Sequence, residues 1–304
     1  MSFSVLLLDN VDSVCKHVFE QRGIKAVQPG TLTLEELNAC IGEYDGLVVR
    51  SATKVTPELL QHAPKLKVIG RAGVGVDNID IPASTAKGVL VMNTPDGNTI
   101  STAEHTCGLI IAMSRNIPEA VQTVKGGGWN RKAYMGIEVH GKTLGVVGLG
   151  KIGSEVARRM KVFGMEIISY DPFSTQEHAQ NLGVKLVELE ELLSTSDYVT
   201  VHTPLTEKTK GLISLANKEG LKKGMRLVNC ARGGLIDENA LEKKIKKKSN
   251  IEVILDCFSN EPYRGKLLKY NNVLFSPHVS SFSKETRDLM EKNSFKNCVD
   301  NIRI

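Results

Sequence analysis

The stretch VVGLGKIGSEVARRM, residues 146–160, is the segment that decides the fold. Gly148, Gly150 and Gly153 fit the pattern G-x-G-x-x-G, between an apolar run and a run with helical periodicity. In such a turn the first glycine permits a tight bend, the second lets a pyrophosphate approach the backbone, and the third lets the helix pack on the strand. The helix N-terminus then presents unpaired N–H groups to the phosphates. The stretch therefore predicts a dinucleotide-binding strand–turn–helix unit.

An acidic residue follows this turn at a suitable distance. Asp171 ends the apolar run EIISYD, 18 residues beyond Gly153, close to the spacing of about 20 residues in dinucleotide-binding units. An aspartate there accepts hydrogen bonds from the ribose hydroxyls of the adenosine and repels the additional phosphate of NADP. We therefore expect NAD to be the cofactor. The alternative is that Asp171 only caps a turn before Pro172.

Length and composition indicate an ordinary globular protein with room for two domains. The chain has 304 residues, of which 41% are hydrophobic and 24% charged, and its formal net charge is +5. Much of the excess charge lies in KKIKKK, residues 243–248. No aromatic residues alternate with these lysines, so the run is more typical of a solvated helix end than of a nucleic-acid site. We expect no nucleic-acid partner.

The cysteines and the N-terminus point to a cytoplasmic protein. The chain has six cysteines, which are far apart and form neither a C-x-x-C pair nor a pattern with histidines at metal-ligand spacing, so we expect reduced thiols and no metal. The start MSFSVLLLDN, residues 1–10, reads as a first strand rather than a signal peptide. No apolar stretch approaches the roughly 18 residues that a membrane helix needs, so we expect no membrane association.

Short apolar runs alternate with helical patterns along the whole chain, which predicts parallel sheets flanked by helices. A helix is expected after Ser101, where Ser101 and Glu104 have the spacing of a capping box. The segment from Lys284 to Ile304 has an amphipathic helical pattern and could pack on the first unit. Because most of the apolar runs lack strict alternation, we expect strands that are covered on both faces and two doubly wound α/β units. The expected strands are FSVLLLD (3–9), IKAV (24–27), GLVVR (46–50), KVIG (67–70), TLGVVGLG (143–150), EIISYD (166–171), YVTVHTP (198–204), MRLVNCA (225–231), EVILD (252–256) and NVLFSPH (272–278).

Three candidate catalytic residues follow three of the later strands. They are Arg232 in NCARGGLIDE, Glu261 in LDCFSNEP and His278 in LFSPH. In an open parallel sheet ligands bind beyond the carboxyl ends of the strands, so these side chains would face the cofactor. A histidine can accept the proton of a hydroxyl group, a carboxylate can orient that histidine, and an arginine can bind a substrate carboxylate.

Each of these residues also has a structural interpretation. Arg232 could pair with Asp237, Glu261 could sit only in a turn, and a histidine after a proline is usually structural. Two further histidines, His202 and His105, are expected to serve packing. Thr203, which follows His202, is expected to face the cofactor.

These segments, together with VVRSATKVT (48–56), GRAGVGVDNID (70–80) and VMNTPDGN (91–98), resemble the D-isomer-specific 2-hydroxyacid dehydrogenases. The resemblance implies a Rossmann cofactor domain, residues 98–282, inserted into a discontinuous flavodoxin-like substrate domain, residues 1–97 and 283–304. It also implies NAD as cofactor and a homodimer formed through the cofactor domain and its arm near Trp129.

The resemblance assigns further residues to the ligands. Backbone N–H groups from Gly73 to Gly75 would hold the substrate carboxylate. Arg50 and Arg71, at the ends of two expected strands, make a plausible phosphate clamp, unless one of them pairs with Asp45 or Asp77. The other implied cofactor contacts are Lys151, Ile152, Thr203, Cys230, Ala231, Asp256 and Val74 (where relatives tend to have threonine), and the other implied substrate contacts are Ser51, Asn78 and Arg131 of the partner subunit.

The activity that the resemblance implies is oxidation of 3-phospho-D-glycerate to 3-phosphohydroxypyruvate, the first step of phosphorylated serine biosynthesis. One alternative is reduction of hydroxypyruvate, glyoxylate or 2-ketoglutarate by the same chemistry. A second is an NAD-sensing interaction protein, since transcriptional corepressors share this architecture. A third is an inactive relative, because Val279, Ser280 and Ser281 replace the usual Leu-Gly-Ala after the histidine. A separate departure is Asn260, which replaces an acid before Glu261.

Overall fold

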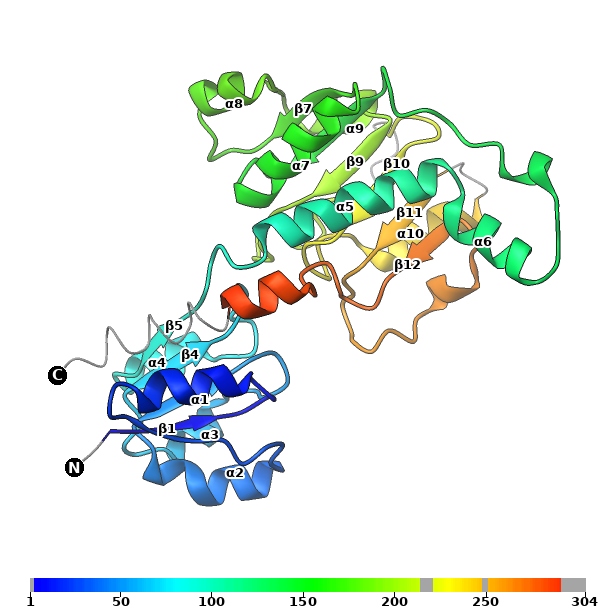
Figure 1. Cartoon of the computed structure of the whole chain (residues 1–304). Helices are drawn as coiled ribbons and strands as arrows, with labels where there is room; N and C mark the ends of the chain where they lie inside the picture. Colours follow the sequence, from blue (N-terminus) through cyan, green and yellow to red (C-terminus); the bar gives the residue numbers. More distant parts are fainter. Residues whose placement is uncertain (1–2, 214–220, 248–250, 291–304) are drawn as a thin grey trace. The chain divides into compact units, whose positions relative to one another are not determined.

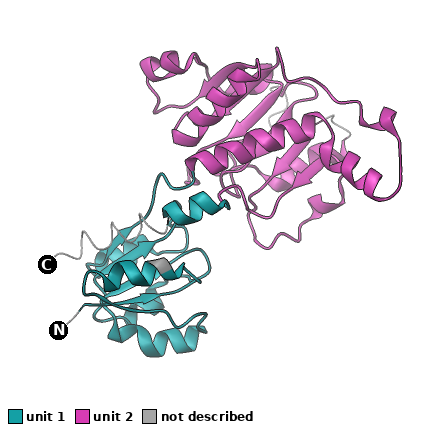
Figure 2. Cartoon of the chain, in the orientation of Figure 1, with its two compact units in different colours: residues 1–98, 282–304 teal, residues 99–281 magenta. Residues whose placement is uncertain are grey.

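The computed structural model describes residues 3–213, 221–247 and 251–290. The chain divides into two compact units, which Figure 2 distinguishes by colour: unit 1 comprises residues 1–98 and 282–304, and unit 2 residues 99–281. Each unit has a parallel sheet with helices on both faces (Figure 1). The predicted fold class, two doubly wound α/β units of which the first is discontinuous in sequence, is confirmed.

Unit 1 is built on a five-stranded sheet in the described residues, in the order β2-β1-β3-β4-β5, and every neighbouring pair is parallel. This is the flavodoxin-like order. Thr33 and Glu36 form a reciprocal capping box at the start of α2, and Thr56 caps α3, whose first residue is Pro57. The elements are β1 (Ser4–Leu7), α1 (Ser13–Glu20), β2 (Lys25–Val27), α2 (Leu34–Cys40), η1 (Ile41–Glu43), β3 (Gly46–Val49), α3 (Pro57–Gln61), β4 (Val68–Arg71), α4 (Ile81–Ala86) and β5 (Leu90–Met92).

Unit 2 is built on a seven-stranded sheet in its described part, in the order β12-β11-β10-β9-β6-β7-β8. From β6 the chain moves outward through β7 and β8, and then returns to the other side of β6 with β9, so the strand order reverses at β6. Ligands of open α/β sheets bind at such a reversal. The elements are α5 (Thr99–Ser114), α6 (Ile117–Lys125), η2 (Arg131–Tyr134), β6 (Thr143–Val147), α7 (Lys151–Val162), β7 (Glu166–Tyr170), α8 (Gln176–Leu182), β8 (Lys185–Leu186), α9 (Leu189–Thr195), β9 (Tyr198–Val201), β10 (Arg226–Asn229), α10 (Glu238–Lys246), β11 (Glu252–Leu255), η3 (Lys266–Lys269) and β12 (Val273–Phe275).

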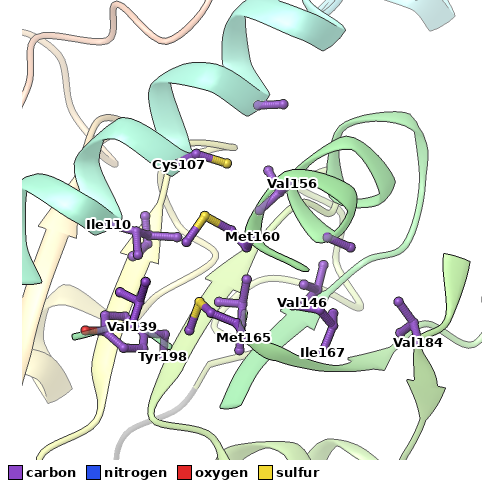
Figure 3. Packing of buried hydrophobic residues seen from close by; sticks show 14 of the residues in the cluster. Cys107, Ile110, Val139, Val146, Val156, Met160, Met165, Ile167, Val184 and Tyr198 are labelled. Atoms are coloured by element: carbon purple, nitrogen blue, oxygen red, sulfur yellow. The ribbon is translucent and has the colours of Figure 1, made fainter. Parts of the chain in front are cut away.

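The central strands of unit 2 (β6, β9, β10 and β11) bury both of their faces, as the continuous apolar runs predict, whereas β7, β8 and β12 are partly exposed. Val146 of β6 packs with Ile110 of α5 and Met160 of α7 in the cluster that Figure 3 shows. Its neighbour Val147 points to the opposite face and packs with Leu192 of α9 in a second cluster. The alternation of side chains along a strand thus divides one apolar sequence between two cores.

The structure contradicts one local prediction and agrees with part of another. The capping box at Ser101 and Glu104 is wrong, because α5 begins at Thr99 and Ser101 lies inside the helix. The amphipathic segment after Lys284 is helical over residues 284–290, and Ser283 Oγ accepts a hydrogen bond from the backbone N–H of Thr286. The rest of that predicted helix, residues 291–304, lies outside the described residues, as does Cys298.

The lysine-rich run begins in the last turn of α10, where Lys246 Nζ lies 3.1 Å from a carboxylate oxygen of Glu242. Lys248, the last residue of the run, lies outside the described residues. Within the described part of the chain, no helix combines the length and the apolar character needed to cross a membrane.

Candidate active site

The glycine-rich turn joins β6 to α7 at the point where the strand order reverses. Gly148 has φ +96°, and a Cβ there would lie 2.7 Å from the carbonyl oxygen of His202. A Cβ at Gly153 would lie 2.0 Å from the carbonyl oxygen of Gly148, so α7 packs directly against the turn. At Gly150, the N-cap of α7, no atom lies within 4 Å of the Cβ position. The turn therefore combines tight packing at two glycines with an open backbone at the third, which fits a pyrophosphate.

Asp171 is tied to this turn by hydrogen bonds. Its Oδ2 accepts a 2.7 Å hydrogen bond from the N–H of Leu149, and its Oδ1 accepts one of 2.8 Å from the N–H of Phe173. The carboxylate thus caps the local turn, as the structural alternative proposed, and is also held beside the glycine turn. Each carboxylate oxygen has a second lone pair that can accept from a ribose hydroxyl.

The segment after β9 carries one further sign of a ligand. Thr203 Oγ1 is buried and has no hydrogen-bond partner among the described residues. A buried hydroxyl usually has a partner, so this atom fits the predicted contact with the cofactor.

Two other predicted residues lie where the sequence placed them. Lys151 and Ile152 form the first turn of α7. His202 packs as expected: its Nε2 lies 2.9 Å from Thr200 Oγ1, and burial lowers the pKa of His202 to about 4.

His278 and Glu261 form a close pair beyond the ends of β12 and β11. His278 Nδ1 lies 2.8 Å from Oε2 and 3.0 Å from Oε1 of Glu261, whose Oε1 also accepts from the N–H of Phe258. Because an ionised carboxylate only accepts hydrogen bonds, Nδ1 carries the proton of the neutral ring and Nε2 carries the lone pair. The side chains are 39% and 38% exposed, so Nε2 can meet a substrate. This is the geometry of an oriented general base.

Arg232 lies in the loop after β10, and hydrogen bonds within this loop hold its backbone. Asn229 Nδ2 donates to the carbonyl oxygen of Arg232, and Arg232 Nη1 donates to that of Ala231. A Cβ at Gly233 would lie 2.0 Å from the carbonyl carbon of Phe258, so the Arg232 loop packs against the loop that carries Glu261. Asp237, the predicted alternative partner of Arg232, instead caps α10.

The thiols near this site are deeply buried. Burial raises the pKa of Cys230, which follows β10, to about 12, and that of Cys107 on α5 to about 11. Burial also raises the pKa of Cys257, which lies within electrostatic range of both Arg232 and Glu261. Thiols with such pKa values are protonated and unreactive at neutral pH.

Asp256, at the end of β11, binds the segment that carries His278. Its carboxylate is completely buried and accepts hydrogen bonds from Ser276 Oγ (2.6 Å) and from the N–H groups of Val279 (3.0 Å) and Ser280 (2.9 Å). Burial opposes ionisation, but His105 and these hydrogen bonds hold the pKa of Asp256 below its ordinary value. The resemblance implied a cofactor contact for Asp256, whereas both of its oxygens are already engaged with residues 276–280.

His105 takes part in the same network. Its Nε2 lies 3.6 Å from Asp256 Oδ1 and 3.4 Å from Ser276 Oγ. Sequence reasoning assigned His105 to packing and missed this link, because His105 and Ser276 are 171 positions apart and no local pattern connects them.

In unit 1, Arg50 directly follows β3 and Arg71 is the last residue of the neighbouring strand β4. Val49 and Arg71 are register partners in the parallel pair of β3 and β4. Asp9, a residue that sequence reasoning missed, accepts hydrogen bonds from the N–H groups of Arg50 (2.7 Å) and Thr53 (3.1 Å). Asn78 Nδ2 donates to the carbonyl oxygens of Arg50 (2.8 Å) and Thr53 (2.6 Å). The loop that contains Arg50 and Ser51 is therefore fixed from both sides.

The backbone beside Arg71 is shaped by glycine. A Cβ at Gly73 would lie 1.3 Å from Arg71 Nη1, so the guanidinium lies directly over that residue. Asn93 Nδ2 donates to the carbonyl oxygen of Val74 at 2.6 Å. Asp45, considered above as a partner for one of the arginines, lies 3.6 Å from Lys67 instead. The structure thus brings Arg50, Arg71, Asn78 and the Gly73–Gly75 segment together at one end of β3 and β4.

The arm of unit 2 contains α6 and η2, with Arg131 at the start of η2. Helix α6 has no buried residue, and its Ile117, Val121 and Val124 are exposed. Trp129 is 79% exposed and Met135 83% exposed. Sequence reasoning identified the arm from its glycines but did not predict α6.

Comparison with known proteins places this arrangement in a family. Residues 107–280 match the model of the D-isomer specific 2-hydroxyacid dehydrogenase, NAD binding domain. D-3-phosphoglycerate dehydrogenase of Rattus norvegicus is 46% identical over 284 residues, 93% of this chain and 53% of the rat protein. The protein of that name from Methanocaldococcus jannaschii is 47% identical over 285 residues, 93% of this chain and 54% of its own. The chain thus spans about half the length of the curated relatives it matches.

A solved structure is similar to this chain over nearly its whole length. The TT0316 protein from Thermus thermophilus superposes with a TM-score of 0.89 at 30% identity, covering 98% of this chain and 96% of its own. The NAD-binding domain is the part that contains the glycine turn, Asp171, Arg232 and Glu261. The chain belongs to the D-isomer specific 2-hydroxyacid dehydrogenase family.

Proposed function

We propose that this chain oxidises 3-phospho-D-glycerate to 3-phosphohydroxypyruvate with NAD, the first step of phosphorylated serine biosynthesis. The observation that carries the proposal is the pair formed by His278 and Glu261, which lies in the same unit as the glycine turn. The names of the relatives, which are 44–47% identical to this chain, support the choice of substrate.

His278 acts as the general base. Its Nε2 takes the proton of the C2 hydroxyl, while Nδ1–H continues to donate to Glu261, whose negative charge stabilises the imidazolium. When bound, NAD accepts the hydride that leaves C2. The C2 carbon becomes a carbonyl carbon, and the proton stays on His278 until it passes to water.

Arg232 is the group that binds the C1 carboxylate and polarises the oxygen on C2. A guanidinium remains charged at all working pH values and presents a planar fork of donors to a carboxylate. The contact between Gly233 and Phe258 supports this assignment, because it holds the Arg232 loop against the Glu261 loop. Residues Gly73–Gly75 add backbone N–H groups for the same carboxylate.

The phosphate is bound by Arg50 and Arg71. Asp9 and Asn78 fix the backbone around Arg50 through hydrogen bonds, so its guanidinium starts from a rigid position. A phosphate monoester carries up to two negative charges at neutral pH, and two arginines at adjacent strand ends match it. Arg131 of the partner subunit contributes a third cation in the proposed homodimer.

The homodimer forms through α6 and the arm. The support is the exposed apolar set on this segment: Ile117, Val121 and Val124 on α6, followed by Trp129 and Met135. A monomer rarely exposes so many large apolar side chains along one segment. Light scattering should give about twice the chain mass of 33.2 kDa. A species with the mass of a single chain, and no larger one, would exclude the dimer.

We also propose that the enzyme works in the cytoplasm. The cysteines of the described residues (Cys15, Cys40, Cys107, Cys230 and Cys257) are free thiols, which suits a reducing compartment.

The test of the function is a comparison of kcat/KM on phosphorylated and plain substrates. We expect NADH formation from 3-phospho-D-glycerate. Oxidation of D-glycerate with NAD, and reduction of hydroxypyruvate, glyoxylate and 2-ketoglutarate with NADH, should be far slower. A preference for any unphosphorylated acid would assign the chain to another activity of the family. A protein that binds NADH but converts none of these acids would instead support a sensing role.

A further inference from the structure

One aromatic ring in unit 1 lies against two arginines. The Cζ atom of Arg50 is 6.0 Å from the centroid of the Phe282 ring, and the Cζ atom of Arg287 is 5.5 Å from the same centroid. Both distances are within the range of cation–π attraction. Arg50 follows β3, whereas Phe282 and Arg287 belong to the segment that returns to unit 1.

The two guanidinium groups have no acidic partner among residues 3–213, 221–247 and 251–290. The carboxylate of Asp9 binds the Arg50 loop through its backbone: among the described residues it accepts from the N–H of Arg50 and from the N–H and Oγ1 of Thr53. Glu285 and Asp288, on the same helix as Arg287, are exposed and make no ion pair with either arginine. Each guanidinium group is therefore a positive charge without a carboxylate partner in this part of the chain, and each can pair with an anion.

The helix that follows Phe282 is anchored to unit 1 by packing. After Phe282 the segment forms the helix over 284–290, in which Thr286 and Met290 are buried. A Cβ at Gly97 would lie within contact distance of the Met290 side chain, 2.4 Å from its Cγ, so this helix packs tightly on the end of the first chain segment. Phe282 itself is 61% exposed, and Arg50 and Arg287 are both partly exposed.

We propose that Arg287 is a further phosphate-binding residue and that Phe282 positions Arg287 and Arg50 for one phosphate group. The ligand is the phosphate monoester of the three-carbon acid, and this inference rests on the proposed function of Arg50. An arginine presents a fork of N–H donors that matches two phosphate oxygens. A ring that contacts two guanidinium groups restricts the freedom of both, so less entropy is lost when the phosphate binds.

The variant Arg287→Ala tests the contact directly. We expect kcat/KM for 3-phospho-D-glycerate to fall about 10- to 100-fold, mainly through KM, because one charge-assisted interaction is lost. The kcat/KM for D-glycerate, which lacks the phosphate, should stay within about twofold, and inorganic phosphate should become a weaker competitive inhibitor. Arg287→Gln, which keeps most of the side-chain volume, should behave in the same way and guards against misfolding of the alanine variant.

The role of Phe282 can be tested separately from that of Arg287. Phe282→Ala should raise KM for the phosphorylated substrate, whereas Phe282→Tyr, which keeps the aromatic face, should not. The losses in Phe282→Ala and Arg287→Ala should be less than additive in the double variant, since the ring acts through the arginine. Lys284→Ala is the matched control: it removes a positive charge from the same helix at an exposed position.

The outcomes distinguish the inference from the proposed function. If the unaltered protein shows no preference for the phosphorylated substrate, the proposed function fails. If that preference exists and both Arg287 variants keep it in full, or if Lys284→Ala reduces it equally, the inference is wrong while the proposed function stands. Selective loss with the Arg287 variants, at unchanged melting temperature and NADH affinity, supports it.

Discussion

His278 Nδ1 lies within 3.0 Å of both carboxylate oxygens of Glu261, although the two residues follow different strands and are 17 positions apart. This contact assigns the ring proton to Nδ1 and leaves Nε2 as the acceptor. The negative charge of Glu261, rather than its hydrogen bond alone, should then matter for catalysis.

Glu261→Gln removes the charge and keeps an oxygen that can accept from Nδ1–H. We expect kcat for 3-phospho-D-glycerate to fall about 10- to 100-fold, because the imidazolium formed during the reaction loses its counter-ion. The dissociation constant for NADH should change little. Glu238→Gln is the matched control, since Glu238 Oε1 accepts from the N–H of Ser259 in the same loop without contacting His278. Equal losses in the two variants would contradict the role of Glu261.

The glycine turn predicts opposite effects of two alanine substitutions. Gly153→Ala places a Cβ 2.0 Å from the carbonyl oxygen of Gly148, so it should lower the free energy of unfolding by about 3 kcal/mol. Gly150→Ala meets no atom within 4 Å and should leave stability within about 1 kcal/mol, but it should weaken NADH binding at least about tenfold. Denaturant unfolding and NADH fluorescence titration measure the two effects. Unchanged NADH affinity in Gly150→Ala would show that the pyrophosphate does not bind at this turn.

Asp171 should set the choice between NAD and NADP. In Asp171→Ala the ratio of kcat/KM with NAD to that with NADP should fall at least about tenfold, because the variant loses the ribose acceptor and the charge that repels the additional phosphate. Asp171→Asn retains an acceptor for the N–H of Leu149 and separates local folding from cofactor choice. An undiminished preference for NAD in both variants would show that Asp171 only caps its turn.

His202 should make stability depend on pH. Burial lowers its folded-state pKa to about 4 from 6.5, so the unfolded chain binds more protons than the folded chain between these values. Well above pH 6.5 His202 is neutral in both states and does not affect the free energy of unfolding. As the pH falls toward 4, His202 lowers the free energy of unfolding, by about 3 kcal/mol at most. His202→Gln, which does not titrate, should show a correspondingly smaller loss of unfolding free energy between about pH 7 and about pH 5. Parallel pH profiles for the two proteins would refute the assignment.

The fold could be predicted from the sequence because its signals are local. Apolar runs of strand length and the glycines at 148, 150 and 153 report the backbone that they form. The candidate site could be predicted as far as strand ends, because parallel strands bring their carboxyl ends to one edge. The start of α5 at Thr99 was missed, since Ser101 has the spacing of a cap but lies within the helix.

The parts that could not be predicted depend on contacts between distant segments. The link from His105 to Asp256 and Ser276 joins three elements, and nothing in the local sequence of any one of them indicates the others. Asp9 reaches the Arg50 loop across 41 positions. A carboxylate that accepts backbone N–H groups is indistinguishable, in sequence alone, from any acid that follows a strand.

The most direct test of the central claim is the rate of NADH formation from 3-phospho-D-glycerate, with 3-phosphohydroxypyruvate trapped, in the unaltered protein and in His278→Asn. His278 has φ +52°, a conformation that asparagine tolerates well, so this variant keeps the backbone while it removes the base. We predict measurable turnover in the unaltered protein and a loss of about 10²- to 10⁴-fold in the variant, at unchanged NADH affinity. Near-normal turnover in His278→Asn, or none with this substrate in the unaltered protein, would contradict the account.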